Sequence, residues 1–194
     1  MMSTISIQEQ REVREKVGKP LLWIGMVSMA MLFAGLTSAY VVSQGKGDWM
    51  KFDLPQLFYV STAIIMLSSV SMNWVLASAR KNNYKNIKIA ALLTLFLGLS
   101  FVVCQIKAWG VLHDAKIYYT GKNSNNAGSF LYLLTFLHLA HLAGGIISIS
   151  VVWINSIQKK YNSENLLGIK LCAIFWHFLD ALWIYLFLFL LFVR

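Results

Sequence analysis

Four ionisable side chains lie inside long apolar runs of this sequence, where a membrane or a protein core would surround them. His138 and His141 are three residues apart in one run, and His177 and Asp180 have the same spacing in another. Residues three apart share one face of a helix. Two imidazoles on one face can bind a metal or a haem, and an imidazole beside a carboxyl can handle protons or contact lipid.

Three interpretations of these four residues are open from the residues alone. The first is a structural clasp, because buried polar groups in a membrane must satisfy one another and thereby fix helix packing. The second is lipid contact or proton handling. The third is ligation of a metal or a haem by histidines from two helices. No cysteine joins the histidines, and Asp180 is better placed as a hydrogen-bond partner than as a ligand. The structural clasp is therefore favoured, and no catalytic, cofactor or metal site is expected in the chain.

The runs that carry these residues are long enough to cross a bilayer as helices. About 20 residues at about 1.5 Å rise each span a hydrocarbon core of about 30 Å. The chain is 58% hydrophobic and 13% charged, whereas about a quarter of a soluble domain is charged. We predict an all-α integral membrane protein with a polar arm at residues 1–19. Pro20, which suits the first turn of a helix, opens a five-helix membrane domain at residues 20–194, with spans at 20–43, 57–79, 89–110, 129–154 and 171–193.

The distribution of basic residues predicts the orientation of the five spans. Eleven of the 17 Lys and Arg residues lie in the arm and in the second and fourth loops, and six lie on the other side. Because basic loops stay in the cytoplasm, we predict a cytoplasmic N-terminus and a C-terminus on the outer face. The excess of basic residues is interpreted as membrane anchoring, so no nucleic-acid partner is expected.

This topology places His141 and Asp180 at a similar depth, with His138 about one turn away. A carboxyl within the hydrocarbon costs about 2.5–3.5 kcal/mol on insertion scales, so Asp180 should face protein and have a partner. The fourth and fifth spans are expected to be neighbours because their connection is short. We therefore predict a hydrogen bond from an imidazole of the fourth span to Asp180. Two stripes of small residues should also allow close helix contacts: Ala30, Ala34 and Ser38, and Ala140, Gly144 and Ser148.

Two stretches of the sequence carry a family resemblance. Residues 176–183, Trp-His-Phe-Leu-Asp-Ala-Leu-Trp, resemble the C-terminal signature of the cytochrome c oxidase subunit III family, the third subunit of haem–copper oxidases. Residues 128–145 look like the paired-histidine helix of that family. The resemblance runs in order from about Pro20 to the C-terminus.

A third stretch, Gln105-Ile-Lys-Ala-Trp109, is similar to the Gln-x-x-Glu-aromatic motif of the family, with Ala108 at the position of the acid. Met29 stands where an acid commonly lies in the first of these helices, so the role of that carboxylate is not carried over. Members with seven spans have two further helices before these five. The residues that match the family motifs are Gln105, Trp109, Trp176 and Trp183.

The resemblance implies an accessory subunit with no redox centre of its own. It would pack against the catalytic subunit I, which carries haem and copper, and against other oxidase subunits and membrane lipids, with bound phospholipid possible. It would stabilise the catalytic subunit and support proton uptake during oxygen reduction to water, in the bacterial inner membrane. The electron donor would be cytochrome c or, in the alternative, a quinol. Functions of a different class are a membrane cytochrome b and a transporter-like scaffold, although no inverted repeat supports a transporter.

Overall fold

The computed structural model describes residues 7–45, 54–118, 125–158 and 166–193, and five long helices make up most of them. They are α1 (Ile7–Gln44), α2 (Gln56–Arg80), α3 (Tyr84–Asp114), α4 (Asn126–Ile157) and α5 (Leu167–Phe192). By length and composition, all five can cross a membrane. The predicted all-α, five-span architecture is therefore confirmed, and each predicted span lies almost entirely within one helix.

The polar arm and the first span form one continuous helix. Residues 7–19 are helical and lead directly into the apolar part of α1, with Pro20 inside the helix. The expectation that Pro20 lies in the first turn is therefore wrong. Glu, Gln, Arg and Lys in the arm favour a helix, and proline removes only one backbone donor. Residues 1–6 of the predicted arm lie outside the described part of the chain.

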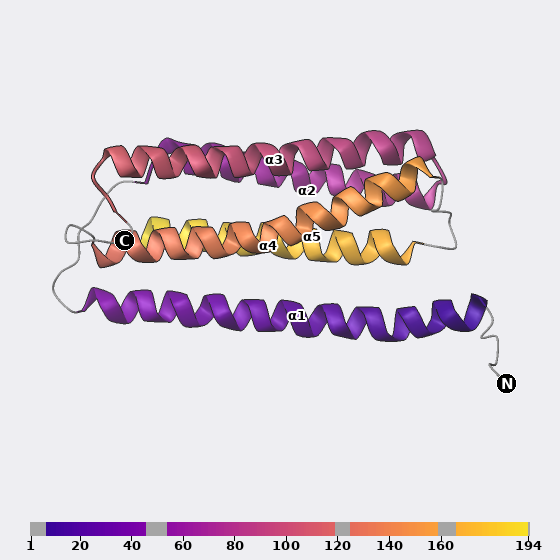
Figure 1. Ribbon diagram of the computed structural model, residues 1–194, viewed down its shortest axis with the longest axis horizontal. Coiled ribbons are helices and arrows are strands. Elements are labelled where there is room, and N and C mark those ends of the chain that lie inside the picture. The colour runs from indigo at the N-terminus through magenta and orange to yellow at the C-terminus, as the bar shows by residue number, and fades with distance from the viewer. Residues whose placement is uncertain (1–6, 46–53, 119–124, 159–165, 194) are drawn as a thin grey trace.

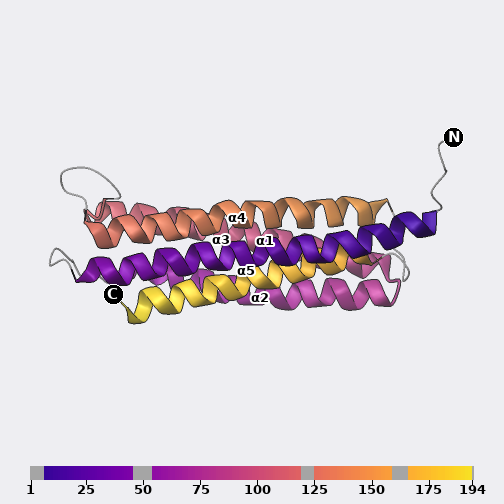
Figure 2. The ribbon, with the colours of Figure 1, turned by 90° about the horizontal axis from the view of Figure 1, so that it is seen from below.

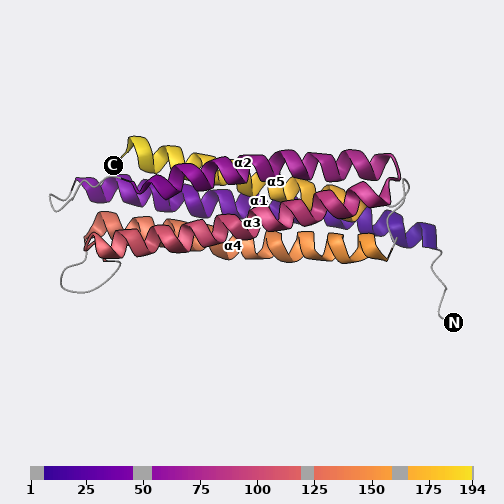
Figure 3. The same ribbon diagram turned by 90° about the horizontal axis from the view of Figure 1, so that it is seen from above.

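Helices α2 to α5 form a closed four-helix ring. α2 packs against α3, α3 against α4, α4 against α5, and α5 against α2. Figure 1 shows α2 with α3 in one layer and α4 with α5 in the next, and Figure 3 shows the same ring from above. Consecutive helices run antiparallel, as in an up-and-down bundle. The expectation that the fourth and fifth spans are neighbours is confirmed.

Helix α1 lies outside this ring and packs against α4 and α5. It is the lowest rod in Figure 1 and lies in front of the ring in Figure 2. Thr37 Oγ1 and Tyr185 Oη are 2.8 Å apart and join α1 to α5. The Gln44 side chain also donates to the Val193 carbonyl. The face of the bundle at which α1, α3 and α5 begin is called the N-terminal face below.

Two glycines make room for the largest side chain in the ring. Trp176 on α5 is fully buried, and its indole lies between Gly98 on α3 and Gly145 on α4. A Cβ atom at Gly98 would be 2.8 Å from the Trp176 ring carbon Cη2, and one at Gly145 would be 3.4 Å from the same ring system. Small residues let helices approach closely in membranes, and here they accommodate an indole.

Candidate functional site

The two tryptophans of the 176–183 motif tie α5 to α2. Both are fully buried. Trp176 Nε1–H donates to Ser68 Oγ at 3.1 Å, and Trp183 Nε1–H donates to Thr62 Oγ1 at 3.0 Å. An indole N–H needs an acceptor when no water surrounds it. The two bonds therefore fix the register of α5 along α2.

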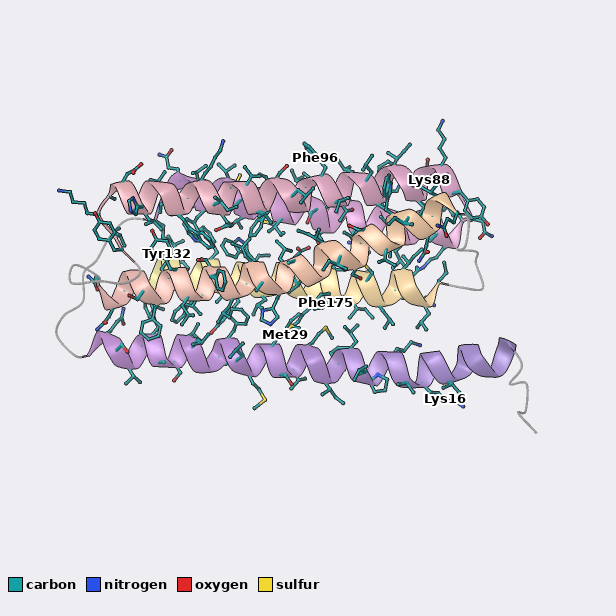
Figure 4. The ribbon with its side chains drawn as sticks, viewed as in Figure 1. Lys16, Met29, Lys88, Phe96, Tyr132 and Phe175 are labelled. Carbon is teal, nitrogen blue, oxygen red and sulfur yellow. The ribbon has the colours of Figure 1, made fainter. Side chains whose placement is uncertain are left out.

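The residues of the 105–109 motif tie α3 to both of its neighbours. Gln105 Nε2–H donates to Ser61 Oγ on α2 at 2.8 Å, and Trp109 Nε1–H donates to Thr135 Oγ1 on α4 at 3.0 Å. The Tyr132 hydroxyl donates to the Trp109 carbonyl, and Figure 4 shows Tyr132 projecting between α3 and α4. Each motif side chain is thus used as an interhelical donor.

The accepting hydroxyls can take these bonds because their own protons are already used. Ser61, Thr62, Ser68 and Thr135 each donate to a carbonyl three or four residues earlier in their own helix. Their oxygen lone pairs therefore remain for donors on neighbouring helices. The α2 hydroxyls were not predicted as site residues. The spacing of Ser61 and Ser68, seven residues apart on one face, is the signal that would have found them.

His177 also contacts α2. Its Nδ1 is 2.7 Å from Ser69 Oγ, and its Nε2 is 3.2 Å from Asn73 Oδ1. An amide oxygen only accepts, so Nε2 carries the proton and Nδ1 accepts from Ser69. His177 is half-buried and Asn73 is exposed, so this pair lies at the outer edge of the seam between α2 and α5.

The predicted hydrogen bond between Asp180 and a histidine of the fourth span is absent from the described residues. Asp180 is 4% exposed and His138 is fully buried, yet neither Asp180 oxygen and neither His138 nitrogen has a hydrogen-bond partner. The His138 ring packs against Trp183 and Phe101 instead, with ring centroids 5.1 and 6.0 Å away. Helices α4 and α5 are neighbours as their short connection predicted, but the α5 ring that contacts His138 is that of Trp183.

His141 faces a different neighbour. Its Nδ1 is 2.7 Å from the carbonyl of Leu137, and its ring centroid is 5.7 Å from that of Phe33 on α1. His138 therefore points into the four-helix ring and His141 towards α1. Of the four residues, His141 and His177 are partly exposed, whereas His138 and Asp180 are buried. Within the described residues, no three His, Cys, Asp or Glu side chains come together in an arrangement that could hold a metal.

The two stripes of small residues face mostly outwards. All three stripe residues of α1, together with Ala140 and Gly144 of α4, are exposed, and Ser148 is half-buried. Met29 lies on the other side of α1, towards α4 and α5 (Figure 4). These stripes leave small-residue faces on the outside of the bundle.

Comparison with known proteins identifies the family of this helical bundle. The chain matches the family described as cytochrome c oxidase subunit III over residues 21–193. The chain belongs to this family.

Three relatives show what share of each chain the similarity covers. A probable cytochrome c oxidase subunit 3 of Rickettsia felis is 31% identical over 140 residues, which are 71% of this chain and 47% of the relative. A probable cytochrome c oxidase subunit 3 of Nocardia farcinica is 28% identical over 90% of this chain and 86% of the relative. A cytochrome bo(3) ubiquinol oxidase subunit 3 of Buchnera aphidicola is 30% identical over 87% of this chain and 89% of the relative. The chain thus spans just under half the length of the Rickettsia relative and most of the length of the other two.

In this subunit III chain, the family-motif residues hold helices together. Gln105, Trp109, Trp176 and Trp183 each donate one hydrogen bond to a hydroxyl on a neighbouring helix. These bonds join the helices of the ring, and three of the described residues still carry unpaired buried polar atoms.

Proposed function

We propose that this chain is the accessory subunit III of a proton-translocating terminal oxidase and carries no redox centre itself. The observation that carries the proposal is the family match over residues 21–193. The use of the motif side chains as interhelical donors supports a structural role, because their N–H groups are committed to packing. The oxygen chemistry would occur on a partner subunit that holds haem and copper, and this chain would stabilise that subunit and support its proton uptake.

The outward stripes of small residues on α1 and α4 are the faces that we assign to contact with the catalytic subunit. Small residues let helix backbones approach closely where lipid would otherwise lie between them. Ala34 on α1 and Gly144 on α4 are both exposed in the isolated chain. Replacing Ala34 by Phe should therefore reduce the amount of partner that co-purifies.

The orientation that we propose has the N-terminus in the cytoplasm and the C-terminus in the periplasm of a bacterial inner membrane. Basic residues support it, since the arm and the loops predicted to be cytoplasmic together carry eleven of the 17 Lys and Arg residues. Arg80 and Lys88, near the α2–α3 connection, then lie at the cytoplasmic boundary, and Lys88 projects away from the bundle at the N-terminal face (Figure 4).

Purification of the chain from native membranes in a mild detergent tests the function. The expected result is a complex containing a haem–copper subunit, with haem absorption that stays with that subunit when the complex is dissociated. If the isolated chain retains haem, a membrane cytochrome b is the better assignment. If no haem–copper subunit co-purifies, the scaffold alternative replaces the proposal.

The same complex distinguishes the two electron donors. Relatives are named as subunits of cytochrome c oxidases and of quinol oxidases. Oxygen consumption with reduced cytochrome c and with a reduced quinol, measured on one preparation, assigns the donor, and cytochrome c is our expectation.

A groove between α3 and α4 is the place that we propose for bound phospholipid. It has a volume of about 790 Å³ and is lined mainly by apolar side chains, among them Ile106, Leu133 and Phe136. Lys107 is exposed beside it and can extend its ammonium group towards a lipid phosphate. Gly110 lines the groove, and a Cβ added there would meet no atom within 4 Å.

A further inference from the structure

All the buried side-chain atoms without a hydrogen-bond partner in the described residues belong to three residues. They are Gln105 Oε1, both ring nitrogens of His138, and both carboxyl oxygens of Asp180. The three residues come from α3, α4 and α5, and all are buried in the four-helix ring. Unpaired polar atoms are therefore concentrated in one region of the protein.

Ring contacts place the three residues in a column along the bundle. His138 lies at the level of Phe101 on α3 and Trp183 on α5, whose own ring centroids are 4.8 Å apart. Gln105 is four residues after Phe101, and Asp180 is three residues before Trp183. Because α3 and α5 run in the same direction, Gln105 lies about one turn, roughly 5 Å, to one side of His138 and Asp180 about one turn to the other.

The chemistry of the column matches bridging water molecules. Gln105 Oε1 needs a donor, the carboxyl oxygens of Asp180 can accept, and a neutral His138 has one donor and one acceptor. None of these atoms has a direct hydrogen-bond partner in the described residues. Buried polar groups in membrane proteins must be satisfied internally, and a buried water typically makes about three such bonds. We propose that the interior of the four-helix ring binds a short file of water molecules that joins Asp180, His138 and Gln105.

A polar seam lies beside the Asp180 end of the file. His177, three residues before Asp180 on α5, bonds Ser69 and contacts the exposed Asn73 at the edge between α2 and α5. Asn73 is seven residues before Arg80, the last residue of α2, so this seam lies in the half of the bundle near the N-terminal face.

The other end of the file lies at Gln105. Gln105 Nε2 bonds Ser61, and the Ser61 hydroxyl bonds the carbonyl of Phe58 in a fully buried environment. Phe58 stacks on Trp183, with ring centroids 6.0 Å apart. Beyond Gln105 the hydrogen bonds therefore end on a buried backbone carbonyl, and among the described residues the file has no polar continuation on that side.

A double-mutant cycle on the complex purified from native membranes tests whether Asp180 and His138 are linked. Asp180→Leu and His138→Leu should each lower the midpoint of thermal unfolding by about 2–4 °C, because each leaves the water-linked partner group unsatisfied. The double variant should lose less than the sum of the two single variants. Asp180→Leu combined with Ser156→Ala is the control and should be additive, since Ser156 is buried but bonds only its own helix. Single variants that leave the midpoint unchanged or raise it would overturn the proposal.

A second measurement uses the wild-type complex and does not depend on folding of a variant. Brief X-ray radiolysis in ¹⁸O-labelled water modifies side chains that lie beside bound water. Trp183 should be labelled although it is fully buried, whereas Phe33, equally buried but outside the four-helix ring, should not. A direct His138–Asp180 bond would show coupling in the cycle without labelling of Trp183, and that result would reject the water file.

Discussion

Replacing Gly98 by Ala tests whether an indole is wedged between two helices. The added Cβ would lie 2.8 Å from Cη2 and 3.2 Å from Cζ2 of Trp176. The indole cannot swing away freely, because its Nε1–H is bonded to Ser68 and the ring also contacts Gly145 on α4. We therefore expect the substitution to destabilise the bundle.

The size of the effect follows from two opposing contributions. Overpacking a well-packed core costs about 1–3 kcal/mol. Replacing glycine by alanine inside a helix returns about 0.5–1 kcal/mol. Gly110→Ala on the same helix supplies the control, because a Cβ there meets no atom within 4 Å. The helix contribution cancels in the comparison, so Gly98→Ala should be less stable than Gly110→Ala by about 1–3 kcal/mol.

Unfolding of the purified chain in mixed detergent micelles, followed by circular dichroism, measures this difference. Trp176→Phe should relieve the clash, because phenylalanine lacks the outer ring carbons that approach Gly98. In that background, Gly98→Ala should resemble Gly110→Ala. Equal stability of the two single alanine variants, with the native tryptophan present, would show that the indole is not held against α3.

Three further predictions concern the other contacts of the bundle. Thr62→Val leaves the buried indole N–H of Trp183 without an acceptor and should lower the free energy of unfolding by about 1–3 kcal/mol, measured by the same detergent titration. Gly110→Leu fills the groove between α3 and α4 and should reduce the phospholipid retained per complex in native mass spectrometry, whereas Gly35→Leu, on open surface of α1, should not. A cysteine replacing the exposed Lys116 should react with a membrane-impermeant thiol reagent applied to intact spheroplasts, and protection there would contradict the proposed orientation.

The sequence was sufficient to predict the elements because hydrocarbon thickness imposes a minimum length on each apolar run. The boundaries differ most at α1, where helix-forming polar residues continue the helix through Pro20. The adjacency of α4 and α5 followed from their short connection. These features depend on length and local preference, which a single sequence contains.

The hydrogen bond to Asp180 could not be predicted in the same way. Rise per residue estimates depth, but it does not give the rotation of each helix about its own axis. His138 and Asp180 both face the interior of the ring, yet His138 packs beside Trp183, about one turn away from Asp180. The rotation of α5 depends on where its tryptophan rings fit. The space for the Trp176 indole beside Gly98 and Gly145 forms only when the helices pack together.

The position of α1 beside a closed ring has a consequence for how this chain is put together. Every indole–hydroxyl bond in the described part of the chain joins two of the helices α2 to α5, and none of these bonds requires α1. A polypeptide that began after Gln44 would keep all of these bonds and would lose the α1 contacts with Tyr185, Phe189 and His141. The indole–hydroxyl bonds that join the helices α2 to α5 therefore do not depend on the first helix, which packs against the outside of the ring.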